Sequence, residues 1–209
     1  MKNFFCLLTI CTSALLTVMT ALTGVSAWAA TVQVQVLDGS GKPLPDAVAY
    51  LESREARAAA KPVAGAELAQ IGKQFSPKVL VVPVGTSVQF PNRDTVRHHV
   101  YSFSLIKNFE LKLYIGTAAA PVVFDKSGIA VLGCNIHDNM AAWVVVVETP
   151  YYGRSAAAGS VVLLNVPVGS YRLRVWHPAM AVGAVPLDQP LTVGAIDASV
   201  SVRMAGLTP

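Results

Sequence analysis

The chain contains few of the residues from which disulfides, catalytic sites and charged binding surfaces are built. Two of its three cysteines, Cys6 and Cys11, lie in an apolar N-terminal stretch, so Cys134 stands alone in the rest of the chain. A lone cysteine excludes an intrachain disulfide framework there. Only 13% of the residues are charged, and the lysines and arginines are scattered. This distribution argues against nucleic-acid binding.

Long apolar runs are also missing, except at the N-terminus. An apolar stretch from Phe4 to Val18 is followed by Ala27-Trp28-Ala29, which fits the small-x-small rule for signal-peptide cleavage. We therefore predict a signal peptide over residues 1–29, a mature start near Ala30 and a periplasmic protein with no membrane span after cleavage. Val25-Ser26-Ala27 offers an alternative cleavage site. An uncleaved membrane anchor is the competing interpretation.

The remainder of the chain has the pattern of β-strands. Valines at 32, 34 and 36 alternate with polar residues, Val79 to Val84 is β-branched, and Ala142 to Glu148 is a nearly continuous valine run. Gly- and Pro-containing turns separate such segments, which predicts an all-β protein of antiparallel sandwiches. One helix is predicted at Arg54 to Ala60, and a second is an alternative at Ala66 to Ile71.

The segment from Cys134 to Met140 carries the clearest chemical signal. Cys134, His137 and Met140 place a thiolate, an imidazole and a thioether on one short loop. Together with a second imidazole this is the ligand set of a mononuclear type 1 copper site, whereas structural zinc requires four strong Cys or His ligands. The alternative is an inert buried thiol beside a methionine that fills the core.

One part of the chain resembles the cupredoxins of the plastocyanin and amicyanin type, over residues 70–148. Asn92-x-Asp94-x3-His98 is similar to the loop that delivers the first histidine, and Cys134-x2-His137-x2-Met140 is similar to the last ligand loop in its short, amicyanin-type spacing. The resemblance implies a Greek-key sandwich that binds one type 1 copper ion through His98, Cys134, His137 and Met140. It also implies electron exchange with redox proteins of the periplasm and no small-molecule substrate.

A second resemblance surrounds the first. Thr31 to Leu51 and Val161 to Val175 are similar to the first two strands and a later hairpin of the carboxypeptidase-regulatory-like, transthyretin-like sandwich. We predict a cupredoxin-like domain over 67–149 inserted into a discontinuous sandwich of residues 30–66 and 150–209. The alternative is one larger sandwich with all strands in common sheets. The whole chain also resembles proteins of the methylamine-utilisation or plastocyanin-like type.

Two arguments disagree over the first histidine ligand. Strand alternation places His99 with Tyr101, Phe103 and Leu105 on the more apolar face, which favours His99 pointing to the core. The loop resemblance favours His98, because a ligand at His99 would lengthen the loop by one residue. We predict His98, since strand ends beside ligand loops are often bulged. Cupredoxins often have Asn after this histidine, so His99 is a departure from the family.

These observations lead to two hypotheses of different classes. The first is a periplasmic electron carrier that is not an enzyme, since no nucleophile, base and acid group together and four histidines leave no separate three-histidine copper site. The second is a non-redox copper carrier or an assembly module of the cell envelope. We expect His177 to be a packing or turn residue, and Asp94 and Asp138 to form loop hydrogen bonds.

Overall fold

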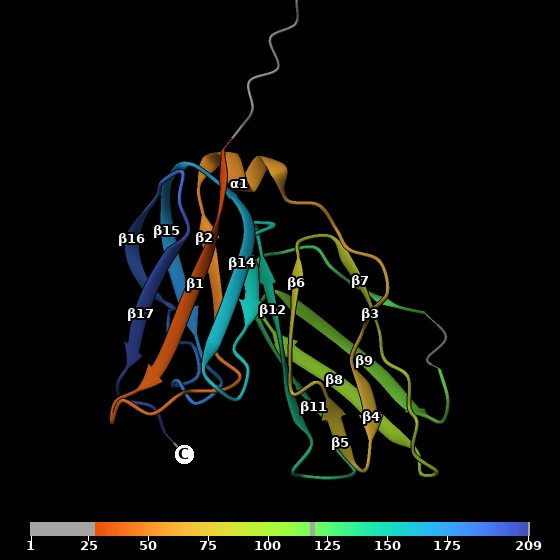
Figure 1. The fold of residues 1–209 in the computed structure, drawn as a ribbon. Helices are drawn as coiled ribbons and strands as arrows, with labels where there is room; N and C mark the ends of the chain where they lie inside the picture. Colours follow the sequence, from red (N-terminus) through yellow and green to blue (C-terminus); the bar gives the residue numbers. More distant parts are fainter. Residues whose placement is uncertain (1–27, 118–119, 209) are drawn as a thin grey trace, which may run out of the picture.

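The computed structural model describes residues 28–117 and 120–208 (Figure 1). The predicted signal peptide lies outside these residues apart from Trp28 and Ala29. The described chain is almost entirely β-structure, which confirms the predicted all-β class. None of its helices is long and apolar enough to cross a membrane.

The strands nearest the two chain ends form two sheets, with the orders β14-β1-β17 and β13-β2-β15-β16. Alternation in the first strand buries Val32, Val34 and Val36 completely, as predicted, and they join one core with Leu173. The strands of these two sheets are β1 (Ala29–Asp38), β2 (Val48–Glu52), β13 (Tyr152–Arg154), β14 (Ser160–Pro167), β15 (Gly169–Trp176), β16 (Leu187–Val193) and β17 (Ala198–Met204).

The intervening strands form a second group, on the right in Figure 1. Their sheets have the orders β6-β12-β11-β8-β9, β10-β7-β3 and β4-β5, and Phe90 and Phe124 lie in the core between the two larger sheets. The strands of this group are β3 (Ala66–Glu67), β4 (Ala69–Ile71), β5 (Gln74–Ser76), β6 (Val79–Pro83), β7 (Thr86–Gln89), β8 (His98–Ser104), β9 (Lys107–Tyr114), β10 (Val122–Phe124), β11 (Gly128–Gly133) and β12 (Ala141–Val147). Each sheet contains strands of one group only. The domain boundaries themselves stay a prediction.

A third apolar cluster joins the two groups. Val144 and Val146 of β12 face the core of their own group, whereas Val145 and Val147 pack with Trp176 of β15. A strand buried on both faces has a continuous apolar sequence rather than an alternating one. This explains the valine run of β12, and it means that the two groups of strands meet through sheet faces.

The helix predictions have opposite outcomes. Helix α1 (Arg54–Ala59) is present, and the Ser53 hydroxyl caps it by accepting the Ala56 backbone N–H at 3.0 Å. The alternative helix over residues 66–71 is wrong, because this segment forms β3 and β4. The Leu68 N–H donates to the Gln89 carbonyl at 2.9 Å, and pairing with a distant strand overrides local helix propensity.

The predicted hairpin over residues 161–175 is also wrong. Its two strands, β14 and β15, join different sheets, where β14 pairs with β1 and β15 pairs with β2. The turn at Pro167-Val168-Gly169 therefore carries the chain from one sheet to the other, and the Tyr171 hydroxyl donates to the Pro167 carbonyl across it at 2.9 Å. Both strands bury valines and leucines in the shared core, so sequence pattern alone does not distinguish this corner from a hairpin.

Candidate metal centre

Three of the four predicted ligands come together at one end of the five-stranded sheet. His98 begins β8, and Cys134 and His137 lie on the loop between β11 and β12. Their potential ligand atoms all lie within 4.8 Å of one another. Two donors bound to one ion at about 2.0–2.3 Å are at most about 4.6 Å apart. The side chains are thus arranged close to the spacing that a shared metal ion requires.

One ring nitrogen of each histidine in this cluster has no partner. Nδ1 of His98 and Nδ1 of His137 are buried and make no hydrogen bond, and the two ring centroids are 5.0 Å apart. Buried polar atoms without a partner are rare because they have lost their hydration. A cation between the rings would satisfy both nitrogens. One thiol and two imidazoles are donors that suit copper, so the residues present fit a copper ion.

The fourth predicted ligand, Met140, lies on the same loop. Its side chain is buried, and it belongs with Cys134 to the core between the two larger sheets of this group. Its backbone N–H donates to the His137 carbonyl at 3.0 Å, which closes a turn between the two residues. The loop is therefore short and internally bonded. The role of Met140 as a ligand stays a prediction.

Asp94 orients His98. Its carboxylate lies 2.7 Å from Nε2 of His98 and accepts the backbone N–H groups of Gly72 and Lys73 at 2.6 and 2.8 Å. Desolvation alone would raise the pKa of Asp94, but the Lys73 N–H, the His98 ring and the Gly72 N–H together hold this pKa below its ordinary value. An ionised carboxylate keeps the ring proton on Nε2. Nδ1 then has a free lone pair for a metal.

Asn92 connects this pair to the sheet. Its amide nitrogen donates to the carbonyls of Val96 and Tyr114, both at 2.8 Å, and its amide oxygen accepts the Asp94 backbone N–H at 3.0 Å. Burial raises the pKa of Tyr114 to about 12, so its hydroxyl stays protonated and able to donate. The Asn92-x-Asp94-x3-His98 motif is thus one hydrogen-bonded unit that presents the histidine.

His99 is engaged elsewhere. Its Nε2 lies 2.7 Å from a carboxylate oxygen of Glu110, and its ring packs on Tyr101 with centroids 5.6 Å apart. The pairing of β8 with β9 shifts register between His98 and Val100, which is the irregularity expected beside a ligand loop. The structure therefore brings His98 into the cluster and turns His99 toward β9.

The argument from strand alternation, which favoured the side of His99 as the core face of β8 and which the prediction of His98 set aside, does not hold for this strand. Val100 and Ser102 share a side with His98 and are completely buried, whereas Phe103 is 76% and Leu105 100% exposed. Ser102 is accommodated inside because its hydroxyl accepts the Ser104 backbone N–H at 3.2 Å. The more apolar side of this strand thus faces away from the core.

Comparisons with known proteins give a limited result. No family model and no curated protein matches the chain. Among solved structures, a purple cupredoxin from Nitrosopumilus maritimus is 26% identical over 39% of this chain and 99% of its own, with a TM-score of 0.33. A reduced mutant form of amicyanin is 24% identical over 47% of this chain and 98% of its own, with a TM-score of 0.36. A copper-containing nitrite reductase from Thermus scotoductus SA-01 is 24% identical over 54% of this chain and 28% of its own, with a TM-score of 0.37.

His177 is a turn residue, as expected. Its Nδ1 accepts the Ala179 backbone N–H at 3.0 Å, and its Nε2 donates to the Pro45 carbonyl at the same distance. Burial is the main reason why the pKa of His177 is lowered, which favours the neutral ring that these two bonds require. This histidine is therefore occupied away from the cluster.

Sequence reasoning treated Asp94 as a loop hydrogen-bonder, which is confirmed, but missed its contact with His98. The four-residue spacing of Asp94 and His98 in the sequence was an indication of this contact. Whether the two side chains meet depends on the bend of the loop, which the Gly72 and Lys73 N–H groups stabilise from another part of the chain.

Asp94→Asn is expected to lower copper affinity by about 10- to 100-fold, because an amide no longer holds the His98 ring proton on Nε2 with a charged acceptor. Competition with a chelator of known affinity measures the change. Asp125→Asn is the matched control, since Asp125 pairs with Lys107 at 3.1 Å within the same group of strands. Equal affinity of the Asp94 variant and the control would remove Asp94 from the site.

Proposed function

We propose that this chain is a type 1 copper protein of the periplasm that carries single electrons between redox proteins. His98, Cys134, His137 and Met140 are its ligands. The observation that carries the proposal is the cluster of one thiol and two imidazoles whose buried Nδ1 atoms have no partner. A copper ion held by these donors would supply a one-electron couple between Cu(I) and Cu(II).

The protein's own residues support this role by holding the donors still. His98 is fixed through Asp94 and Asn92, and the loop of Cys134 to Met140 lies between two paired strands, β11 and β12. Donors that keep their positions in both oxidation states reduce the rearrangement that accompanies electron transfer. Rigid support from strands is therefore suited to a carrier.

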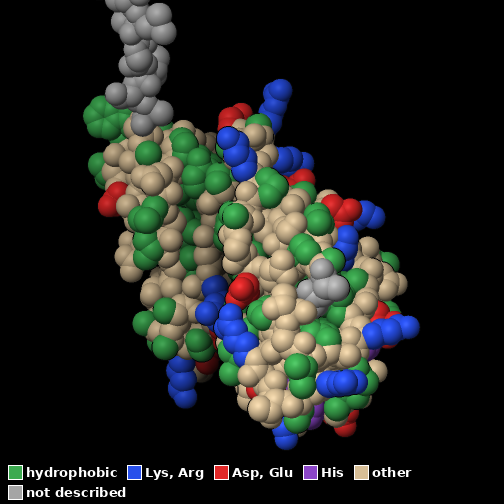
Figure 2. Space-filling model, turned by 90° about the vertical axis from the view of Figure 1, so that its right-hand side faces the viewer, with side chains coloured by type: hydrophobic (Ala, Val, Ile, Leu, Met, Phe, Trp, Pro, Cys, Tyr) green, Lys and Arg blue, Asp and Glu red, His purple; other side chains and the backbone are tan. Residues whose placement is uncertain are grey.

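His137 provides the route to the surface. It is partly exposed, whereas His98 and Cys134 are buried, and the neighbouring Ile136 is 49% exposed. A ring edge at the surface within a partly apolar rim allows close approach of another protein. On the face shown in Figure 2, lysine and arginine side chains are spread out rather than gathered into one patch.

The proposed role is electron transport rather than catalysis. The chain has four histidines, of which His99 binds Glu110 and His177 forms a turn. The Nδ1 of His99 has no partner, but no third histidine lies beside it, and His177 uses both of its ring nitrogens in hydrogen bonds. The proposed periplasmic location rests on the N-terminal pattern and on the lone cysteine, which a ligand role would protect from oxidation.

Loading with Cu(II) tests the proposal and its first ligand together. The wild-type protein is expected to show intense visible absorption, because a short Cu(II)–thiolate bond absorbs strongly. His98→Gly should lose this absorption and regain it on addition of imidazole, whereas the matched variant His99→Gly should keep it. A colourless loaded wild type would instead indicate a non-redox metal carrier. Rescue at position 99 alone would transfer the ligand role to His99.

A further inference from the structure

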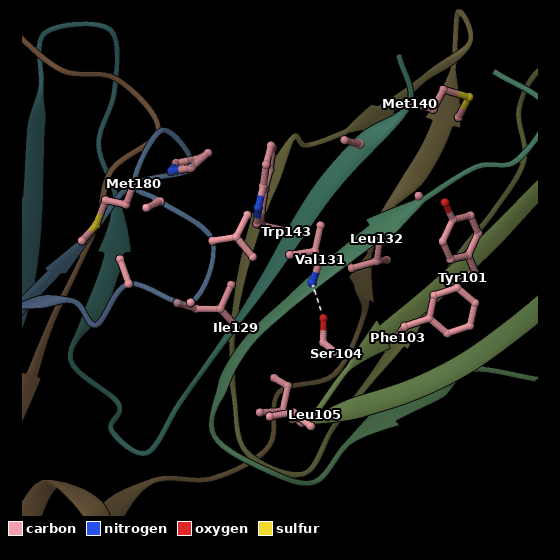
Figure 3. A pocket seen from close by; sticks show the side chains of 18 of the residues that line it. Tyr101, Phe103, Ser104, Leu105, Ile129, Val131, Leu132, Met140, Trp143 and Met180 are labelled. Atoms are coloured by element: carbon pink, nitrogen blue, oxygen red, sulfur yellow. Dashed lines mark hydrogen bonds between the residues drawn. The ribbon is translucent and has the colours of Figure 1, made fainter. Parts of the chain in front are cut away.

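A large cavity lies between the two groups of strands, beside the candidate metal centre. Its volume is about 1080 Å³, at the upper end of the range of small-molecule sites. One wall is the outer face of β8, β11 and β12, and the other is the segment from Pro178 to Ala184 that follows β15. Figure 3 shows Met180 on one side, Tyr101 and Phe103 on the other, and Val131 and Trp143 between them.

Large apolar side chains that line this cavity are exposed to solvent instead of being buried in a core. Phe103, Leu105 and Val182 line it and are 76%, 100% and 98% exposed. Phe103 belongs to the side of β8 that carries its aromatic residues while its serine-bearing side faces the core, and Leu105 lies in the turn that follows this strand. Such an inversion of the usual pattern is expected where a surface is kept for binding rather than for stability.

Aromatic side chains give the cavity its shape. Tyr101 and Phe103 pack together with ring centroids 5.1 Å apart, and Trp143 and Trp176 pack 6.4 Å apart from strands of different groups. Flat rings pack well against other flat rings. These four aromatic side chains therefore favour a planar apolar ligand.

The cavity reaches the candidate metal centre. Cys134 and Met140 are part of its lining. The Tyr101 ring lies on the backbone of Gly133, where a Cβ atom would come within 2.8 Å of it. A side chain at position 133 would thus displace the ring, and the glycine allows this aromatic wall to lie against the residue that precedes Cys134.

The charged residues in the cavity lining indicate which ligand charge the cavity accepts. Among the described residues that line the cavity, Asp138 is the only acidic one, and no lysine, arginine or histidine is present. Asp138 and Asn135 belong to the same loop as Cys134. This end of the cavity accepts hydrogen bonds and repels anions, whereas the remainder is apolar.

We infer that the cavity binds a neutral, planar aromatic molecule that carries a hydroxyl group. The rings lie between Phe103 and Trp143, and the hydroxyl donates to the Asp138 carboxylate at the end shared with Cys134. Because no bound metal is required, this inference is independent of the proposed copper chemistry.

Titration of the full chain with 2-naphthol tests the inference, in the metal-free and copper(I) forms. In the full chain with its N-terminal residues retained, Trp28→Phe leaves Trp143 and Trp176 as the two tryptophans, and both line the cavity. Their indole N–H signals in a nitrogen–proton NMR spectrum are expected to shift and saturate. The anion naphthalene-2-sulfonate, with the same rings, is expected to give no saturating shift.

Two variants locate the binding. Phe103→Ser should weaken naphthol binding by about 3- to 10-fold through loss of ring packing. Leu105→Ser, at a fully exposed position, should weaken it too, whereas Val162→Ser, an exposed valine outside the cavity, should have no effect. Absence of a saturating shift, equal binding of the sulfonate, or binding unaffected by both cavity variants would overturn the inference. Shifts that follow protein concentration instead of naphthol would overturn it in favour of a second copy of the chain.

Discussion

Cys134→Ser protein loaded with Cu(II) is expected to lose the intense visible absorption of the wild type almost completely. A serine hydroxyl does not provide the short thiolate bond on which this absorption depends, whereas His98 and His137 can still hold the metal more weakly through nitrogen. Absorption spectra of equally loaded proteins measure the loss. The substitution is small, so the buried loop should keep its fold, which circular dichroism checks.

Met140→Leu is the matched comparison on the same loop. The leucine side chain has a volume similar to that of methionine, so packing in the core changes little. The visible absorption should persist, and the reduction potential should rise because loss of a weak axial donor disfavours Cu(II) more than Cu(I). An unchanged potential would remove Met140 from the ligand set. Persistent intense absorption in the Cys134 variant would remove the thiolate, and with it the type 1 assignment.

Phe90→Ala and Leu173→Ala are expected to destabilise different parts of the chain. Both side chains are completely buried, Phe90 in the core of the group of strands β3 to β12 and Leu173 in the core of the other group. Losses of about 3–5 kcal/mol for Phe90 and about 2–5 kcal/mol for Leu173 follow from removed contacts and the cavities left behind. Calorimetry and copper retention on heating measure the two effects.

The two variants differ if the groups of strands are separate domains. Phe90→Ala should then lower the temperature at which copper is released, while Leu173→Ala should lower the unfolding temperature of the other group and affect copper release less. Val162→Ser is again the control at an exposed site. Equal shifts of one cooperative transition would show that the apolar cluster of Val145, Val147 and Trp176 unites both groups into one folding unit.

The sequence by itself determined the strand content and the position of the candidate ligand loop. Alternation specifies which side of β1 is buried, because successive side chains of a strand point to opposite faces. Cys134, His137 and Met140 lie so close in the chain that their spacing alone places three potential donors on one loop. The prediction of His98 also came from a local motif, in which Asn92 and Asp94 set the loop length.

Tertiary structure decided the features that depend on distant segments. The sequence did not indicate which side of β8 faces the core, because a buried serine is acceptable once its hydroxyl is bonded and exposed aromatic residues are acceptable once they line a cavity. The separate sheets of β14 and β15 depend on which partners, β1 and β2, each strand meets. The cavity itself exists only where β8, β11 and β12 approach the segment after β15. The spacing of residues in the sequence predicts local geometry. Strand pairing and packing between distant segments depend on the folded chain and cannot be predicted from local spacing.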